Sequence, residues 1–325
     1  MTLKEKQAQT LDQKIYHFYE VVDTYYHKLD GKVYCAFSGG KDSTVMVYLL
    51  DKWCSMMKYE KIPLVFNNTT NEYSEILDYV KGYGDRVIWL RPKITFAQSL
   101  VKYGYPLISK EQSQMISEAK NTKSDYLRDL RINGKIRVSK NSGKEYKSVT
   151  VSKKWLHILE SDIEVTSKCC DVLKKWPVKK FEKEFGLSAI IGTTADESNL
   201  RKQQYIKNGC NTFGERNICR PLSIFTEKDI WELILRENII LSTVYYDKII
   251  DGELVKGEKR TGCAYCAFGV QYENPYDTKF HRLKKREPKR FNSIMEKLGY
   301  RKALELIGID IDSKPIPDPQ LRLFD

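Results

Sequence analysis

The segment CAFSGGKDSTVMVYLL (residues 35–50) is the most informative about the fold of this chain. An apolar run leads into a polar turn, and a second apolar run with helical spacing follows it. The turn consists of Ser38, Gly39, Gly40, Lys41, Asp42 and Ser43. Two adjacent glycines between a strand and a helix indicate a place where a ligand approaches the backbone closely. Backbone amides and the helix N-terminus favour an anion there, so we predict a phosphate site with Lys41 as a mobile cation.

Strands and helices alternate on both sides of this turn. Buried-type strands are predicted at 32–37, 62–67, 85–90 and 187–192, and helices are predicted from about Asp42, Glu72 and Glu197. This alternation predicts an α/β fold in which a parallel sheet is sandwiched by helices. Ligands of such sheets bind at the carboxyl ends of the strands. The turn 38–43, Asn68–Thr70 and Gly192–Arg201 should therefore meet along one edge.

Two further segments frame this sheet. Residues 3–29 have the apolar spacing of one amphipathic helix, which predicts a helical lead-in over 1–30. Residues 120–155 form a basic insertion, and the turn signals Asn133-Gly134 and Asn141-Ser142-Gly143 predict one or two β-hairpins in it. Its cations are Lys120, Lys123, Arg128, Arg131, Lys135, Arg137, Lys140, Lys144, Lys147, Lys153 and Lys154.

The C-terminal segment carries a second basic run, KFHRLKKREPKR (279–290), with a helical pattern. We therefore predict two domains. The first, 1–270, binds the nucleotide and includes the lead-in and the insertion, while the second, 271–325, is basic and helical.

The composition is that of a globular protein with an excess of positive charge. The 325 residues include 55 Lys and Arg against 43 Asp and Glu, a net charge of +12, and 41% are hydrophobic. The sequence contains no apolar stretch long enough for a bilayer and starts without the apolar core of a signal peptide, which predicts a cytoplasmic protein with no membrane partner. A basic surface attracts polyanions such as DNA or tRNA, and an ordinary solvated lysine-rich surface is the alternative.

The eight cysteines are unevenly distributed. A reducing compartment excludes structural disulfides, and Cys35 and Cys54 lie in apolar runs typical of core residues. Four others form the pairs Cys169-Cys170 and Cys263-x-x-Cys266, which indicates a metal site. Four thiolates suit a [4Fe–4S] cluster or zinc. A directly adjacent cysteine pair fits poorly around a small tetrahedral ion, which favours the cluster.

Several motifs together resemble one known family. SGGKDS resembles the SGGxDS motif of the PP-loop ATP pyrophosphatase superfamily, whose fold is adenine nucleotide alpha hydrolase-like, a Rossmann-like arrangement. VFNNTTNEYSEILDYV (65–80) is similar to the second-strand motif of the phosphoadenosine phosphosulfate (PAPS) reductase family, with Asn68 at its Asp position and Thr70 at its Gly position. GTTADESNLR (192–201) resembles its G-x-R-x-x-E-S-x-x-R motif, with Thr194 in place of the arginine.

RPLSIFTEKDIWELI (220–234) is similar to a further segment of that family, so the resemblance covers roughly residues 30–300. It implies an adenine-nucleotide site with Lys41 and Asp42 as catalytic residues. Lys41 would stabilise charge on the phosphates, and Asp42 would orient Mg²⁺ or only cap the helix. The implied nucleotide-binding residues are Ser38, Gly39, Gly40, Lys41, Asp42, Ser43, Asn68, Thr69, Gly192, Glu197 and Arg201.

The cysteine pairs resemble the [4Fe–4S] signature of the family's iron-sulfur branch, which includes adenylyl-sulfate reductases and relatives acting in DNA phosphorothioation. The ligands implied are Cys169, Cys170, Cys263 and Cys266. Thiol-dependent reductases of the family use a nucleophilic cysteine in the C-terminal tail. No cysteine follows Cys266 here, so that nucleophile is missing.

Three functions remain open from the sequence. The leading hypothesis is an enzyme that cleaves ATP to AMP and pyrophosphate and adenylates an acceptor, in sulfur transfer or nucleic-acid modification, with a cysteine desulfurase or another sulfur donor as partner. The second is a PAPS or adenylyl-sulfate reductase that uses an external or atypical thiol. The third is a basic nucleic-acid-binding module whose nucleotide site is regulatory.

Overall fold

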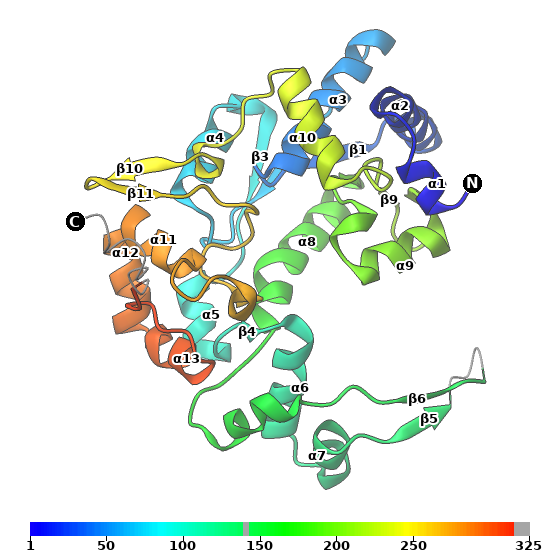
Figure 1. Ribbon diagram of the computed structural model, residues 1–325. Helices are drawn as coiled ribbons and strands as arrows, with labels where there is room; N and C mark the ends of the chain where they lie inside the picture. Colours follow the sequence, from blue (N-terminus) through cyan, green and yellow to red (C-terminus); the bar gives the residue numbers. More distant parts are fainter. Residues whose placement is uncertain (139–142, 315–325) are drawn as a thin grey trace, which may run out of the picture. The chain divides into compact units, whose positions relative to one another are not determined.

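The computed structural model of the protein describes residues 1–138 and 143–314 (Figure 1). Lys140, the turn residues Asn141 and Ser142, and the tail from 315 lie outside the described residues. The chain divides into two compact units. Unit 1 comprises Met1–Pro92, Lys174–Asp247 and Gly257–Gly262, and unit 2 comprises Lys93–Leu173, Lys248–Lys256 and the chain from Cys263 onward. The units interleave along the sequence and so differ from the consecutive segments 1–270 and 271–325 that we predicted.

A six-stranded sheet forms the centre of unit 1, in the order β3-β2-β1-β7-β9-β8. Neighbouring strands are parallel, except that β8 runs antiparallel to β9. The strands are β1 (Val33–Ala36), β2 (Leu64–Asn67), β3 (Val87–Leu90), β7 (Ser188–Ile191), β8 (Asn211–Thr212) and β9 (Ile218–Cys219). The predicted α/β fold and its four predicted strands are thus confirmed, whereas β8 and β9 were not anticipated.

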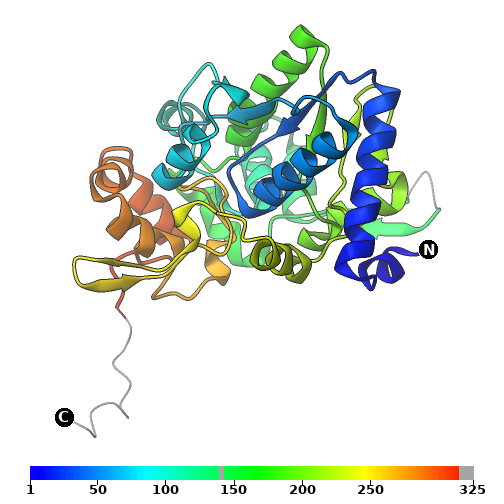
Figure 2. The same cartoon turned by 90° about the horizontal axis from the view of Figure 1, so that it is seen from above.

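Helices cover both faces of this sheet (Figure 2). Side chains alternate along a strand, and those of Tyr34, Val65 and Ala189 pack against Phe181 of α8 (Trp176–Phe185). The opposite face is covered by α3 (Lys41–Met57), which begins directly after the polar turn that follows β1. The turn is therefore fixed between the central strand and a helix whose core residues are buried.

The lead-in is two helices, α1 (Leu3–Gln7) and α2 (Leu11–Lys28), so the prediction of one helix over 3–29 was wrong. The break has a local cause: the Thr10 hydroxyl accepts the Gln13 N–H, and the Gln13 side chain accepts the Thr10 N–H. Such a capping box starts a helix anew. A buried ion pair of 2.7 Å joins Lys14 of α2 to Asp229 of α10 (Glu227–Arg236).

The remaining helices of unit 1 start slightly later than predicted. α4 (Ser74–Lys81) follows β2, and α9 (Asn199–Asn208) begins after Ser198, whose hydroxyl accepts the Arg201 N–H. Short 3-10 or π turns occupy Gly84–Arg86, Lys153–Glu160, Cys170–Lys175, Ala195–Glu197, Thr243–Tyr245, Val270–Tyr272 and Ser293–Lys297.

Unit 2 is mainly helical. Its helices are α5 (Phe96–Tyr103), α6 (Lys110–Asn121), α7 (Asp125–Ile132), α11 (Lys279–Arg286), α12 (Pro288–Asn292) and α13 (Tyr300–Leu306). Its paired strands are β4 (Leu107–Ile108) with β12 (Ala267–Phe268), β5 (Ile136–Val138) with β6 (Glu145–Lys147), and β10 (Lys248–Ile250) with β11 (Glu253–Val255). The hairpin β5–β6 and the helical C-terminal segment confirm the prediction, whereas α7 was not anticipated. Among the described residues no helix has the length and hydropathy needed to cross a membrane.

Candidate functional site

The polar turn has a shape that requires glycine. Gly39 has a φ of +69°, and a Cβ there would lie 2.9 Å from Val80 Cγ2 of α4. Glycine alone satisfies both the backbone conformation and this close packing. The serines stabilise the turn from within, because the Ser43 hydroxyl donates to the Gly40 carbonyl (2.9 Å) and lies 3.0 Å from Ser38 Oγ.

Lys41 is buried, with 4% of its surface exposed. Its Nζ lies 3.3 Å from the Asp42 carboxylate and 3.6 Å from Glu227 Oε1. Arg260 approaches the other oxygen of Glu227 at 3.9 Å. Lys41 is therefore a cation held in place at the start of α3, and not the mobile cation that we predicted.

Two hydroxyl groups close over the turn. The Lys41 N–H donates to Tyr245 Oη at 2.8 Å, and this oxygen lies 2.7 Å from Thr261 Oγ1. A Cβ on Gly40 would be only 2.8 Å from Thr261 Oγ1. Burial raises the pKa of Tyr245 to about 12, so its phenol is neutral. Sequence reasoning missed both residues, and no motif marks them.

The end of β7 meets the same turn, as predicted from the parallel sheet. A Cβ on Gly192 would lie 3.1 Å from the Asp42 carbonyl oxygen, so the segment after β7 packs directly against the first turn of α3. Glu197 and Arg201 form an ion pair. Burial lowers the pKa of Arg201, the Asp42 carboxylate raises it, and the nearby guanidinium groups of Arg260 and Arg220 lower it. Positive charge thus gathers near Asp42.

The segment after β2 is a compact turn. The Asn68 side chain accepts the Thr70 N–H at 2.9 Å, and the Thr69 hydroxyl donates to Glu72 at 2.6 Å. Thr70 has a φ of +63°, in the region that favours glycine, which explains why the related motif has glycine there. Asn68 and Thr69 lie at the carboxyl end of β2, the strand beside β1. Their hydrogen bonds are made within this turn.

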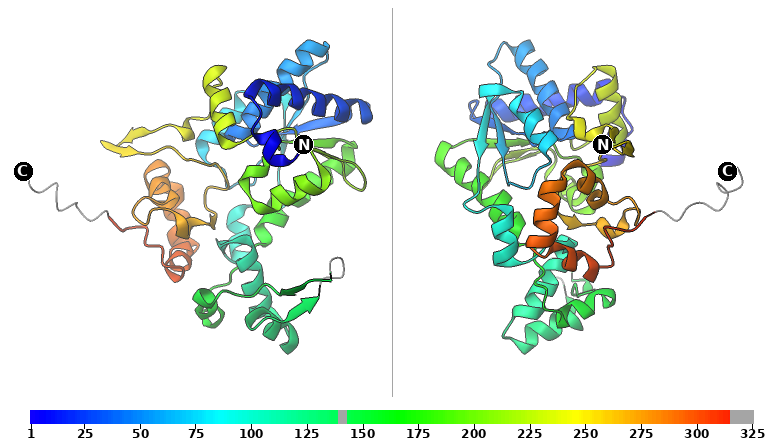
Figure 3. Two further views of the ribbon diagram at one scale, coloured as in Figure 1. Left: turned by 45° about the vertical axis from the view of Figure 1, so that its right-hand side comes forward. Right: turned by 90° about the vertical axis from the view of Figure 1, so that its left-hand side faces the viewer.

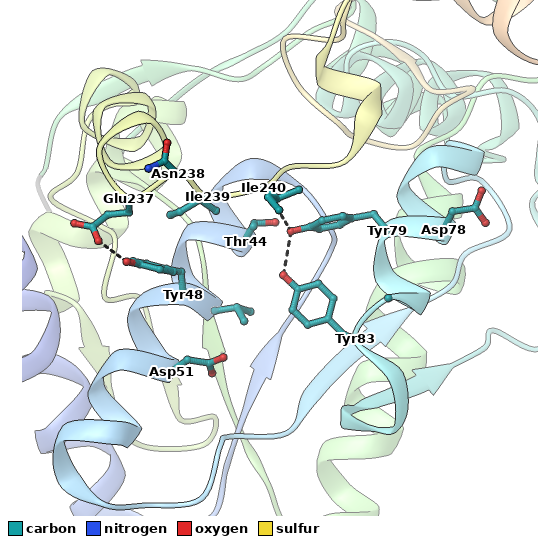
Figure 4. Close-up of a pocket in the computed structure, with 12 residues that line it drawn as sticks. Thr44, Tyr48, Asp51, Asp78, Tyr79, Tyr83, Glu237, Asn238, Ile239 and Ile240 are labelled. Carbon is teal, nitrogen blue, oxygen red and sulfur yellow. Dashed lines mark hydrogen bonds between the residues drawn. The ribbon is translucent and has the colours of Figure 1, made fainter.

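A pocket of about 550 Å³ lies between α3, α4 and Glu237–Ile240 (Figure 4). Tyr48 donates to Glu237, and Tyr79 bonds both Tyr83 and the Ile240 carbonyl. Its carboxylates are already paired: Asp51 with Arg86, Asp78 with Lys81 and Glu237 with Lys52. Thr44 Oγ1 is buried there and has no hydrogen-bond partner among the described residues. None of the predicted site residues lines this pocket.

The four paired cysteines all belong to unit 2. Cys169 is buried, and Cys170, Cys263 and Cys266 are half-buried. A hydrogen bond with Cys170 raises the pKa of the Cys169 thiol, and burial and the charges of Cys170, Cys266 and Cys263 raise it further. Burial raises the pKa of Cys266 to about 11. The neighbouring thiolates therefore disfavour ionisation of Cys169 and Cys266, which a bound cationic group would relieve.

The Cys263–Cys266 turn is anchored on three sides. The Lys279 ammonium donates to the carbonyls of Cys263 (2.9 Å) and Cys266 (3.0 Å), and the Tyr300 hydroxyl donates to the Tyr265 carbonyl (2.7 Å). β12 begins at Ala267 and pairs with β4. The backbone of this turn is thus fixed by hydrogen bonds that do not involve the sulfur atoms.

The donor chemistry of these four residues fits a thiolate-bound group, while the described residues include no set of three or more His, Cys, Asp or Glu side chains arranged to hold a metal ion. Cys170 opens a π-helical turn, Cys170–Lys175, that runs into α8.

The fold and the turn together define an α/β protein of the PP-loop class, with its glycine turn at the carboxyl edge of a parallel sheet. The sequence model of the phosphoadenosine phosphosulfate reductase domain matches residues 32–123 and 106–294. The chain belongs to this family. No curated protein sequence matches it at a significant level.

Solved structures that match this chain include three enzymes. PAPS reductase from Candida auris, as a phosphate complex, has a TM-score of 0.38 and 12% identity over 70% of this chain and 82% of its own. FMN adenylyltransferase from Candida glabrata with ATP has a TM-score of 0.40 and 10% identity over 75% and 64%. The U34-tRNA thiolase NcsA from Methanococcus maripaludis, with its [4Fe–4S] cluster, has a TM-score of 0.35 and 15% identity over 88% and 79%. The family assignment rests on the family model.

Proposed function

We propose that the chain binds ATP at the turn 38–43 and cleaves it between the α- and β-phosphates, in sulfur transfer or nucleic-acid modification. An acceptor oxygen forms a bond to the α-phosphorus, the bond to the bridging oxygen breaks, and pyrophosphate leaves with the electron pair. The acceptor proton passes to solvent. The observation that carries this proposal is the Gly39-Gly40 turn at the N-terminus of α3, with a held cation beside it.

Each residue has a physical role in such a step. The amides at the start of α3 and the Lys41 ammonium would stabilise the charge that develops on the leaving pyrophosphate. Arg201 and Arg260 would add positive charge near Asp42. Asp42 would hold Mg²⁺ between phosphate oxygens, since carboxylates are the usual protein ligands of this ion.

A reductase acting on PAPS or adenylyl sulfate is the second candidate. A reductase needs a thiolate, and the cysteines outside the two sequence pairs do not readily form one. Burial raises the pKa of Cys210 to about 11 and raises that of Cys219 as well. Both are buried in unit 1, so a reductase of this sequence would depend on an external thiol.

The same enzyme would hold a [4Fe–4S] cluster through Cys169, Cys170, Cys263 and Cys266, with zinc as the alternative. When bound, the cluster would supply either a structural crosslink or a sulfur-transfer centre, and a cysteine desulfurase or another sulfur donor would be its partner. Lys279 would keep the Cys263–Cys266 carbonyls in place and offset the negative charge of the thiolates.

The deciding experiment compares two substrates under identical conditions. Purified protein is incubated with Mg·ATP, with and without single-stranded DNA or tRNA, and AMP and pyrophosphate are measured. A parallel incubation contains adenylyl sulfate or PAPS with dithiothreitol, and sulfite is measured. Pyrophosphate release dependent on acceptor supports the proposal, while sulfite formation without ATP turnover supports the reductase.

Nucleic acid is the acceptor class that the insertion favours. Hairpin β5–β6 extends from the α6–α7 region of unit 2 (Figure 3), and all of its described strand residues are exposed. Arg137 pairs with Tyr146 across the strands, and Tyr126 lies beneath the Lys135 ammonium at 4.2 Å. Exposed tyrosines beside cations form a surface on which unpaired bases stack.

The other two arginines predicted for this surface have structural partners. Arg131 donates to Glu118 at 2.6 Å, and Arg128 donates to the carbonyls of Ala119 and Thr122. These bonds tie the base of the insertion to α6. We therefore assign the nucleic-acid contacts of the insertion to Lys135, Arg137, Tyr126 and Tyr146.

Removing the two tyrosines should weaken single-strand binding without altering its salt dependence. Stacking on an aromatic side chain is worth about 1–3 kcal/mol per base, so Tyr126→Ala and Tyr146→Ala should each weaken binding about tenfold. Lys135→Ala with Arg137→Ala should instead lower the slope of log K against log salt by about 1.4, or about 0.7 per cation.

A labelled single-stranded oligonucleotide, titrated at several salt concentrations by fluorescence anisotropy, measures both effects. The matched control is Lys179→Ala with Lys180→Ala, which removes two exposed lysines from α8. Equal losses in the control and in the hairpin variants would mean that only the overall charge matters and that the hairpin is ordinary solvated surface.

A further inference from the structure

The segment Gly257–Gly262, here called the clasp, packs closely against the residues that precede β10. A Cβ on Gly257 would lie 2.2 Å from the Tyr245 carbonyl oxygen, so only glycine fits this contact. The Glu258 N–H donates to the Val244 carbonyl at 2.8 Å. The clasp and the Val244–Tyr245 backbone therefore hold one another in place within unit 1.

Two chains of side-chain contacts connect the clasp to the turn 38–43, here called the phosphate turn. Thr261 Oγ1 bonds Tyr245 Oη, which accepts the Lys41 N–H, and Arg260 faces Glu227, which faces the Lys41 ammonium. Gly40 is the N-cap of α3, so the Lys41 amide is the first of the helix amides that have no partner within the helix. Such amides are the donors that phosphate oxygens use.

We propose that the Tyr245 and Thr261 hydroxyls occupy the place of phosphate oxygens in the nucleotide-free protein, and that the phosphates of the nucleotide displace them. The proposal rests on the proposed function and adds how the site opens. A neutral phenol oxygen accepts the Lys41 N–H as a phosphate oxygen would, but a charged acceptor forms a hydrogen bond about twice as strong. Thr261 Oγ1 also lies where a ligand would approach Gly40.

Displacement has a consequence for the cysteines. Gly262 alone separates Thr261 from Cys263 in the sequence. A clasp that moves when phosphate binds therefore moves the backbone that leads into the Cys263–Cys266 turn. By linkage, a nucleotide that alters the cysteine turn is itself favoured or disfavoured by whatever the cysteines bind.

Removing either hydroxyl should tighten phosphate binding. Calorimetry with ATP and with inorganic pyrophosphate is the measurement, on wild type, Tyr245→Phe and Thr261→Val. Tyr245→Phe deletes the internal acceptor of the Lys41 N–H, and Thr261→Val deletes the hydroxyl that bonds this acceptor, so we expect the affinity of each variant for both probes to rise about fivefold, the size of one ordinary hydrogen bond. Tyr246→Phe, which alters the neighbouring and more exposed tyrosine, should leave both affinities unchanged.

The second measurement follows the cysteine turn without nucleotide turnover. The rate of amide hydrogen exchange in the segment 257–266, read by mass spectrometry, should change when ATP is added to wild type. An unchanged rate would overturn the clasp movement. Weaker or unaltered binding by Tyr245→Phe and Thr261→Val would overturn the displacement, because the hydroxyls would then bind the phosphate or play no part. If wild type binds ATP and either of these results is obtained, the proposal about the clasp alone is refuted. If neither wild type nor any variant binds ATP, the proposed function is refuted together with the proposal about the clasp.

Discussion

Lys41→Ala is expected to lower the affinity for ATP by about 100-fold. A hydrogen bond to a charged group contributes up to about 3 kcal/mol, and about 1.4 kcal/mol corresponds to a factor of ten. The structure adds a second cause. Lys41 lies between the Asp42 carboxylate and Glu227, so its removal takes the nearest cation from Asp42 and leaves Glu227 with Arg260 as its cation. Calorimetry with ATP measures the loss.

The fold should survive this change, because both carboxylates remain solvated: the Asp42 side chain is 23% exposed and the Glu227 side chain is 48% exposed. Thermal unfolding checks this point. Lys52→Ala is the matched control: it removes an exposed lysine from the same helix and should leave ATP binding unchanged. Gly40→Val should be as severe as Lys41→Ala, because its side chain would block the approach of the phosphates to the backbone of the turn. Wild-type affinity in both variants would refute the phosphate turn.

Replacing any one of Cys169, Cys170, Cys263 and Cys266 by serine is expected to remove the bound iron-sulfur cluster. Anaerobically purified wild type should be brown, with absorption at about 400 nm and about four iron and four sulfide per chain. Three thiolates hold a cubane weakly, and a serine hydroxyl at neutral pH is not a comparable ligand. Absorption spectra with iron and sulfide analysis give the result for each variant.

Cys54→Ser is the matched control, since Cys54 is a buried core residue of α3 in unit 1. It should retain the colour of wild type. A colourless wild type with one tightly bound zinc would contradict the cluster and leave the phosphate turn untouched. A protein without any metal would leave these four cysteines as thiols, in keeping with the raised pKa of Cys169 and of Cys266.

The sequence predicts the central strands of the sheet because short, local residue patterns specify them. β1, β2, β3 and β7 are short apolar runs bounded by turns, and the glycine pair between β1 and α3 has no other common explanation. β8 and β9 are two residues each, and Asn211-Thr212 has no apolar periodicity. They are strands only because β7 presents a free edge, which is a property of the folded sheet.

The residues of the candidate site likewise divide into those that the sequence predicts and those that only tertiary packing brings to the site. Gly39 was predicted from the glycine pair and Gly192 from the family resemblance, and a Cβ at either position would lie close to a neighbour. Tyr245 and Thr261 act through hydroxyl groups that tertiary packing brings to the Lys41 amide from distant positions, and no spacing marks them. The contact of Lys41 with Glu227 likewise comes from another helix, α10. The break at Thr10 did carry a signal, Thr10-x-x-Gln13, although the apolar spacing runs through it.

The order of strands also governs how this chain must be made. β1 lies at the centre and pairs with β2 on one side, but its other neighbour, β7, begins only at Ser188. A ribosome adding about 5–20 residues per second therefore leaves the nascent β1 edge open for on the order of 10 s. An open, apolar strand edge pairs readily with other chains. Fragments that end before Ser188 should consequently aggregate, and the growing chain should depend on a chaperone that shields this edge until β7 has emerged.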